Sequence, residues 1–197
     1  LGVWHISKDR SVREVGIVPV GYHPDAVTSL GGNIVAVAVE GASQIAFWHI
    51  TEATAPSKLK EISTPFPTRE VVAYDIDHDG QQDLVLAPYK GEQVAILWGQ
   101  GNMQFSAPQL LQAAPIPWHP RIVDWNQDGR PDLIWSDWDT GSVRLHLNEG
   151  ERKFKLEMLQ PAQIGAPRQT GVGDINRDGK PDAVMAMSAG KKARVLL

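Results

Sequence analysis

The chain has 197 residues, a formal net charge of −4 and no cysteine, which excludes disulfide bonds and thiolate metal sites. A negative net charge does not indicate a positively charged surface for binding nucleic acid. No apolar run reaches the roughly 18 residues of a membrane-spanning helix. No basic segment followed by an apolar stretch opens the chain, so no signal peptide is visible.

Short apolar runs along the whole chain predict strands. Gly2–Ile6 is similar to Ala46–Ile50, and Asn33–Ala38 lies between them. The runs are rich in Val, Ile, Leu and Trp and are bounded by Gly, Asn, Asp and Pro, which is typical of strands in an all-β protein. Almost no segment keeps the 3.6-residue period of a helix.

An acidic loop of the form Asp-x-Asp/Asn-x-Asp-Gly-x-x-Asp recurs at residues 75–83, 124–132 and 174–182. The first residues of these loops lie 49 and 50 positions apart, and each loop is followed at once by an apolar run. A fourth copy occurs upstream, where Asn33–Ala38 lies 50 residues before Asp83–Pro88. Its loop, Thr28–Gly32, has no carboxylate, so this repeat is expected to have lost its metal.

A repeat of this length has room for about four strands, and this predicts an all-β β-propeller of four-stranded blades. A β-sandwich also has many short strands, but its strands do not recur as units. We expect a single repeat domain of about four blades, or a segment of a larger, seven-bladed propeller. The expected units are 1–21 (partial), 22–69 (without loop carboxylates), 70–118, 119–168 and 169–197 (partial). A self-closed four-bladed ring and a homo-oligomer remain alternatives.

The acidic loops predict three Ca²⁺ sites, because calcium takes six to eight oxygen ligands and the loops offer carboxylates at alternate positions. The seventh position would contribute only its backbone carbonyl, so its side chain is free to vary. The glycine at the sixth position suits a chain that must turn back with positive φ. The expected ligands are Asp75, Asp77, Asp79, Gln81, Asp83, Asp124, Asn126, Asp128, Arg130, Asp132, Asp174, Asn176, Asp178, Lys180 and Asp182.

Three alternatives to these sites differ in chemistry. An EF-hand needs Glu at loop position twelve, where this chain has Leu86, Trp135 and Met185. Magnesium keeps its waters and binds few carboxylates. Solvated turns without an ion would leave ten of the 23 acidic residues crowded into three loops, where like charges oppose folding.

These residues resemble the FG-GAP/VCBS repeat family of integrin α-chain propellers and many secreted bacterial proteins, with Val172–Ala183 as the nearest match. The resemblance implies a calcium-binding propeller in which the loop joins the innermost strand of a blade to the next strand. Val71–Tyr74, Arg121–Val123 and Thr170–Gly173 would then be innermost strands. It also implies an extracellular or periplasmic protein, and the family includes adhesins, lectins and domains attached to enzymes.

A ligand site is sought among the seven tryptophans. Trp4, Trp48 and Trp98 hold equivalent positions in successive units and are expected to pack between blades. Trp118, His119 and Arg121 are expected on a connection between blades, where a flat aromatic beside hydrogen-bond donors suits a sugar or a protein partner; Trp138 is a further candidate. An inward-packed Trp118 is the alternative.

No catalytic motif is visible, since the chain has no nucleophile elbow, His-Glu-x-x-His or phosphate loop. The sequence therefore predicts a binding module for carbohydrate or a protein. The alternatives are a catalytic or non-catalytic domain of a polysaccharide-acting enzyme, and a structural repeat used in assembly.

Overall fold

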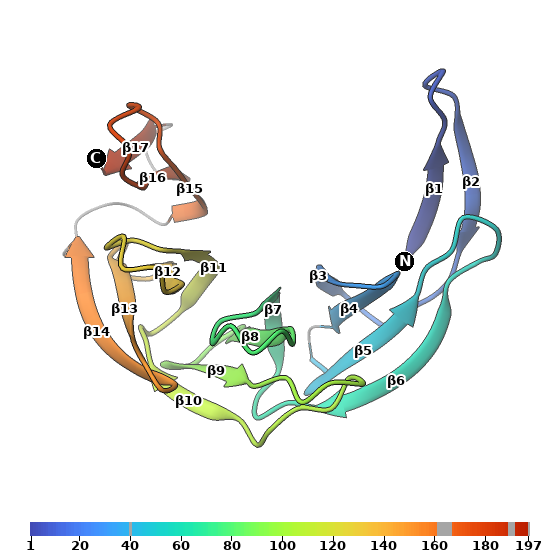
Figure 1. Ribbon diagram of the computed structural model, residues 1–197, viewed down its shortest axis with the longest axis horizontal. Coiled ribbons are helices and arrows are strands. Elements are labelled where there is room, and N and C mark those ends of the chain that lie inside the picture. Colours follow the sequence, from blue (N-terminus) through green and yellow to red (C-terminus); the bar gives the residue numbers. More distant parts are fainter. Residues whose placement is uncertain (40, 161–166, 189–191, 197) are drawn as a thin grey trace.

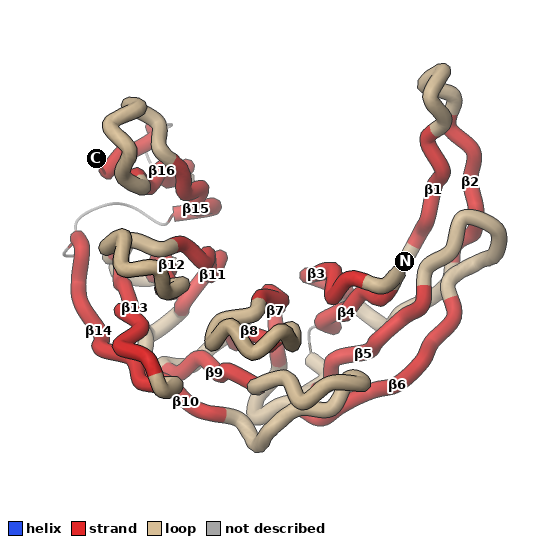
Figure 2. Tube along the Cα trace, viewed as in Figure 1, coloured by secondary structure: helices blue, strands red, loops and turns tan. Residues whose placement is uncertain are grey.

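The computed structural model describes residues 1–39, 41–160, 167–188 and 192–196. Strands and loops make up this part of the chain, as Figure 2 shows. No helix in the described residues is of a length and hydropathy that could cross a membrane. The all-β prediction is confirmed.

The strands form five antiparallel sheets that follow one another along the chain. Each sheet pairs its strands in sequence order. The sheets are β1(Gly2–Ile6)–β2(Val12–Ile17); β3(Pro24–Gly31)–β4(Ile34–Val39)–β5(Gln44–His49)–β6(Ser57–Ser63); β7(Thr68–Tyr74)–β8(Asp83–Pro88)–β9(Gln93–Leu97)–β10(Gln109–Gln112); β11(Pro117–Val123)–β12(Asp132–Asp137)–β13(Val143–Gly150)–β14(Lys153–Gln160); and β15(Pro167–Gly173)–β16(Asp182–Met187)–β17(Lys192–Leu196). We call the last four the first to fourth blades.

The sheets lie side by side along an open arc, with the β1–β2 sheet at one end and the β15–β17 sheet at the other (Figure 1). The first strand of each blade lies on the inner side of the arc, and β7 contacts both β3 and β11, which in turn contacts β15. The prediction that residues 71–74, 121–123 and 170–173 belong to innermost strands is confirmed. This is the β-propeller arrangement, and the described residues do not form the self-closed ring considered above.

Each acidic loop joins the innermost strand of its blade to the second strand, so the three loops lie at the same end of their blades. In the first blade a tight turn replaces the loop. There Gly31, Gly32 and Asn33 have φ of 81°, 56° and 63°, and β4 begins at Ile34. Such left-handed angles are open to Gly and Asn, which is why a short turn can form here.

The hydrophobic core lies between consecutive blades. One cluster joins Phe47 and Ile45 of the first blade to Leu84 and Leu86 of the second, and similar clusters lie between the second and third and between the third and fourth blades. β8 and β12 are buried over their whole length because both of their faces are covered. The blades thus depend on their neighbours for burial of apolar surface.

The equivalent tryptophans differ in burial. Trp48 and Trp98 are 7% and 4% exposed and pack between sheets, as expected. Trp4 is 52% exposed, so the prediction is wrong for this residue. Trp4 belongs to the two-stranded sheet β1–β2, where fewer neighbouring strands cover it.

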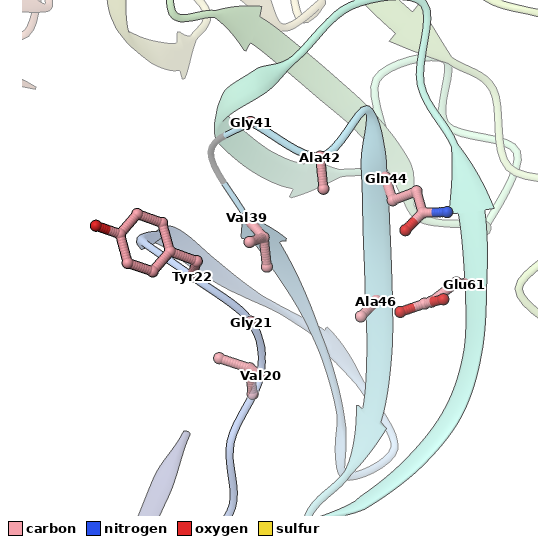
Figure 3. A pocket seen from close by; sticks show the side chains of 9 residues that line it. All are labelled: Val20, Gly21, Tyr22, Val39, Gly41, Ala42, Gln44, Ala46 and Glu61. Carbon is pink, nitrogen blue, oxygen red and sulfur yellow. The ribbon is translucent and has the colours of Figure 1, made fainter.

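A cavity of about 430 Å³ lies between the β2–β3 connection and the first blade (Figure 3). Residues 20–22 form one side, and Val39, Gln44 and Ala46 of the first blade form the other. It lies near the β4–β5 turn, at the end of the blade opposite the β3–β4 turn. It is therefore remote from the acidic loops.

Candidate metal sites

The first acidic loop brings three carboxylates together. One oxygen each from Asp75, Asp77 and Asp83 lies within 4.8 Å of the others. Two oxygens on opposite sides of a calcium ion are about 4.8 Å apart, since each lies about 2.4 Å from it. These three side chains therefore fit a single calcium ion.

All three loops share one hydrogen-bond pattern around the carboxylate at loop position one. This carboxylate accepts hydrogen bonds from the backbone N–H groups of positions five and six, at 2.8–3.1 Å. The position-five carboxylate accepts one from the N–H of position seven. Gly80, Gly129 and Gly179 have φ of 84–86°, as predicted for the sixth position. The loops are thus preformed in the same shape.

The ninth-position aspartates are buried anchors. Both oxygens of Asp83 accept hydrogen bonds from the backbone, one from Ile76 N at 2.8 Å and one from Gly99 N at 2.7 Å. Asp132 accepts equivalent bonds from Trp125 N and Asn148 N. Each anchor therefore ties the start of its loop to the end of the third strand of the blade.

Burial raises the pKa of Asp83 to about 6, and the nearby carboxylates of Asp77 and Asp79 contribute to this rise. The hydrogen bonds from the two backbone N–H groups act in the opposite direction and lower the pKa. Burial also raises the pKa of Asp132. A raised pKa means that the charged form of the carboxyl is unfavourable in the folded protein. A cation beside these carboxylates would relieve this cost.

We expect Asp83 to stabilise the metal-free protein as the pH falls. Its folded-state pKa of about 6 exceeds its unfolded value of 3.8, so its contribution is complete below 3.8 and is lost as the pH rises through 6. From pH 7 to pH 5 the gain amounts to about 1 kcal/mol.

The measurement is urea unfolding in chelator at both pH values, with Asp83→Asn as the comparison. His146, whose pKa burial lowers to about 4, acts in the opposite direction in both proteins, so the difference between them isolates Asp83. The same pH dependence in both proteins would contradict the expectation.

The third loop position separates the first loop from the other two. Asn126 donates its amide to Asp128 Oδ2 at 2.9 Å, and Asn176 donates to Asp178 Oδ2 at 3.2 Å. Asp77 accepts instead a bond from Arg152, which belongs to the next blade. The backbone carbonyls of Gln81, Arg130 and Lys180 remain predicted ligands, and the Arg130 side chain pairs with Asp128 of its own loop.

The sequence did not reveal the contacts between neighbouring loops. The fourth-position side chain of one loop hydrogen-bonds to the sixth-position carbonyl of the next, from His78 to Gly129 O and from Gln127 to Gly179 O. Asn148 donates to Ile76 O across the same blade boundary. The fourth positions have φ of 59–65°, a left-handed geometry that sequence spacing alone does not indicate.

Trp118, His119 and Trp138, predicted to contact a sugar or a protein partner, lie toward the end of the blades opposite the acidic loops. The fourth such residue, Arg121, lies nearer the second acidic loop, which begins at Asp124. Trp118 and His119 belong to β11, so the prediction that they form a connection is wrong. Pro117 begins the strand, and Pro120 lies at a shift in its register, two places where a sheet tolerates proline. Trp118 is only 6% exposed and packs against Trp138, with 4.1 Å between ring centres.

Polar and aromatic groups surround this buried tryptophan. Arg69 lies 4.0 Å from the Trp118 ring centre and 5.4 Å from that of Tyr89, which is 42% exposed. His119 Nδ1 lies 3.3 Å from Glu70, and Arg121 bonds to the Pro120 carbonyl. We call Arg69, Tyr89, Trp118 and Trp138 the aromatic surface.

Solved structures share this fold. A protein from Lactobacillus plantarum matches 98% of this chain with a TM-score of 0.75 and 16% identity. A chain of the crystal structure of BBS1N in complex with ARL6DN matches 89% with a TM-score of 0.58 and 15% identity. This chain spans 59% and 54% of those two chains. No curated protein sequence matches.

The sequence profile of the FG-GAP-like repeat matches twice, at residues 75–135 and 124–185. Each match begins at the first carboxylate of one acidic loop and extends past the next loop into the strand that follows it. Together the matches cover more than half of the chain. The protein therefore belongs to the FG-GAP-like repeat family.

Proposed function

We propose that this β-propeller is a calcium-stabilised binding module that acts outside the cell. The observation that carries the proposal is the convergence of Asp75, Asp77 and Asp83 in a loop whose hydrogen-bond pattern recurs in the next two blades. Each site would use the side chains of loop positions one, three, five and nine and the carbonyl of position seven. Calcium would supply charge neutralisation and would cross-link the two strands that each loop joins.

The charge of the chain supports calcium as the ligand of these loops. Three calcium ions would change the formal net charge of the chain from −4 to +2. Calcium sites of extracellular modules have dissociation constants of about 10⁻⁴–10⁻³ M, and calcium at such levels is found outside cells. The test is calorimetric titration of the chelator-treated chain with calcium chloride.

We propose the aromatic surface as the place where a carbohydrate binds. Tyr89 offers an exposed ring with the Arg69 guanidinium beside it. His119, which lies 5.6 Å from the Trp118 ring centre and pairs with Glu70, adds further polar groups. A sugar ring packs its C–H groups on an aromatic face while its hydroxyls bond to such groups. Trp118, being buried, would support Arg69 and Trp138 rather than touch the sugar.

We expect Tyr89→Ala to weaken glycan binding about five- to 150-fold, if a sugar ring on an aromatic side chain contributes about 1–3 kcal/mol, as a stacked base does. A glycan array in calcium, followed by calorimetry on the best binder, measures this. Tyr74→Ala is the matched control, since Tyr74 is equally exposed (43% against 42%) but lies beside the first acidic loop.

Equal losses in the two variants would contradict the assignment of the aromatic surface. Binding of a protein but of no glycan would replace the carbohydrate by a protein partner. Turnover of a polysaccharide would favour the enzyme alternative.

A further inference from the structure

Arg152 lies at the tip of the β13–β14 hairpin and reaches the acidic loop of the preceding blade. Its Nε and Nη2 atoms both lie 2.7 Å from Asp77 Oδ2, and Nη2 lies 3.7 Å from Asp79 Oδ2. The guanidinium also lies over the Trp98 ring, 4.6 Å from its centre. Gln109 donates a hydrogen bond to the Arg152 carbonyl and so holds the tip in place. One cation from the third blade thus bridges two carboxylates of the second.

The first loop differs from the other two at the position that Arg152 contacts. In the second and third loops the amide of Asn126 or Asn176 donates to the position-five carboxylate. Asp77 has no N–H to donate, and it adds a fourth carboxylate to its loop. Arg152 provides the donors that Asp77 lacks. Arg152 of the next blade thus pairs with the loop that carries the extra negative charge, whereas in the second loop Arg130 of the same loop pairs with Asp128.

The hairpin of the second blade provides an internal control. Its tip, Gly101–Phe105, matches Gly150–Phe154 of the third blade, 49 residues later, and Met103 takes the place of Arg152. Both residues have left-handed backbones, with φ of 56° and 62°. Met103 lines a cavity with Leu30 and Ile34, which flank the β3–β4 turn without carboxylates, and Gly80 and Gln81 close its other side. Arginine therefore faces the acidic loop, and methionine faces the turn without one.

We propose that Arg152 is a built-in counter-ion that competes with calcium for Asp77 and Asp79 and so sets the calcium affinity of the first loop. This rests on the proposed function of the loops. In the metal-free protein Arg152 reduces the repulsion among the loop carboxylates. Arg152 already contacts Asp77 Oδ2, and its positive charge repels a second cation at this carboxylate, so the free energy of the ion pair opposes calcium binding. By the same linkage, calcium in the first loop is expected to weaken the contact between Arg152 and the second blade.

The decisive variant is Arg152→Met, which copies the residue found at the equivalent tip. Met103 shows that methionine is compatible with this backbone angle. The variant is made together with Asp128→Ala and Asp178→Ala, which leave the first loop as the intact site, and is titrated with calcium chloride by calorimetry. The expected result is about three- to fivefold tighter calcium binding than in the same background with Arg152, which is the upper part of the range for an exposed ion pair.

Two further variants separate competition from a structural role. Arg152→Lys keeps the charge but not the two-pronged geometry or the stacking on Trp98, so it is expected to tighten binding less than Arg152→Met. In the presence of Asp77→Asn, the effect of Arg152→Met is expected to fall below about twofold, because the main partner is gone. A purely structural Arg152 would give weaker calcium binding on its removal, which is the opposite sign.

The outcomes distinguish this proposal from the proposed function. A wild-type chain that binds no calcium would overturn both. A wild-type chain that binds calcium, with first-loop affinity unchanged or weakened by Arg152→Met, would overturn the role of Arg152 alone. Circular dichroism of each variant confirms that the sheets are intact.

Discussion

Replacing Asp83 by alanine is expected to lower the free energy of unfolding by about 2–5 kcal/mol even in chelator. The change leaves the buried N–H groups of Ile76 and Gly99 without acceptors, and each unsatisfied buried group costs about 1–3 kcal/mol. Denaturant unfolding of the metal-free protein measures this cost directly.

Asp79→Ala is the matched control for Asp83→Ala. Asp79 belongs to the same loop and is a predicted ligand, but its side chain is exposed and accepts one loop N–H. In chelator this variant is expected to stay within about 1 kcal/mol of the wild type. In calcium both variants should lose the stabilisation of the first site. Equal destabilisation of the two variants in chelator would contradict the anchoring role of Asp83.

Calcium is expected to raise the stability of the chain by about 8 kcal/mol when each of three sites is at 100 times its dissociation constant. The reason is mass action, since a ligand that binds only the folded state contributes about 2.7 kcal/mol per site at that level. Thermal unfolding in calcium and in chelator should differ by more than about 10 °C for a protein of this size.

Magnesium at the same concentration is the control for calcium specificity. It is expected to give a much smaller shift, because it demands a compact octahedral shell and retains its waters. The same melting temperature in calcium, magnesium and chelator would contradict this expectation, because it would mean that metal binding to the loops does not stabilise the fold.

The repeat period and the acidic loop sufficed to predict the sheets, because both are local features. Runs of apolar residues that are bounded by turns and recur every 49 or 50 residues predict a repeated four-stranded unit. The loop likewise specifies its own shape, since its carboxylates bond to backbone groups four and five residues later. These parts of the candidate sites could therefore be assigned from sequence.

The contacts between blades could not be predicted in this way. Arg152 and Asp77 are 75 residues apart, and their pairing depends on how one blade lies against the next. The signal that could have revealed it is the change from Met103 to Arg152 at equivalent hairpin tips, which appears only when the two repeats are aligned.

The start of the strand that contains Trp118 was also predicted wrongly from the sequence, for a different reason. Pro117 and Pro120 resemble the ends of a connection, yet they occupy the start of β11 and an irregularity within it. The strand therefore begins earlier than predicted, and its tryptophan is buried against Trp138. Local breaker residues gave the wrong boundary because irregular strands accommodate proline.

The central claim is that each of the three acidic loops binds one calcium ion, and counting bound ions tests it most directly. Native mass spectrometry of the chain, after equilibration with calcium and removal of excess salt, gives the number of ions per chain. The account predicts three ions in the wild type and two after Asp124→Ala, which removes the first-position carboxylate of the second loop. A wild-type chain without bound calcium, or a count that Asp124→Ala leaves unchanged, would contradict it.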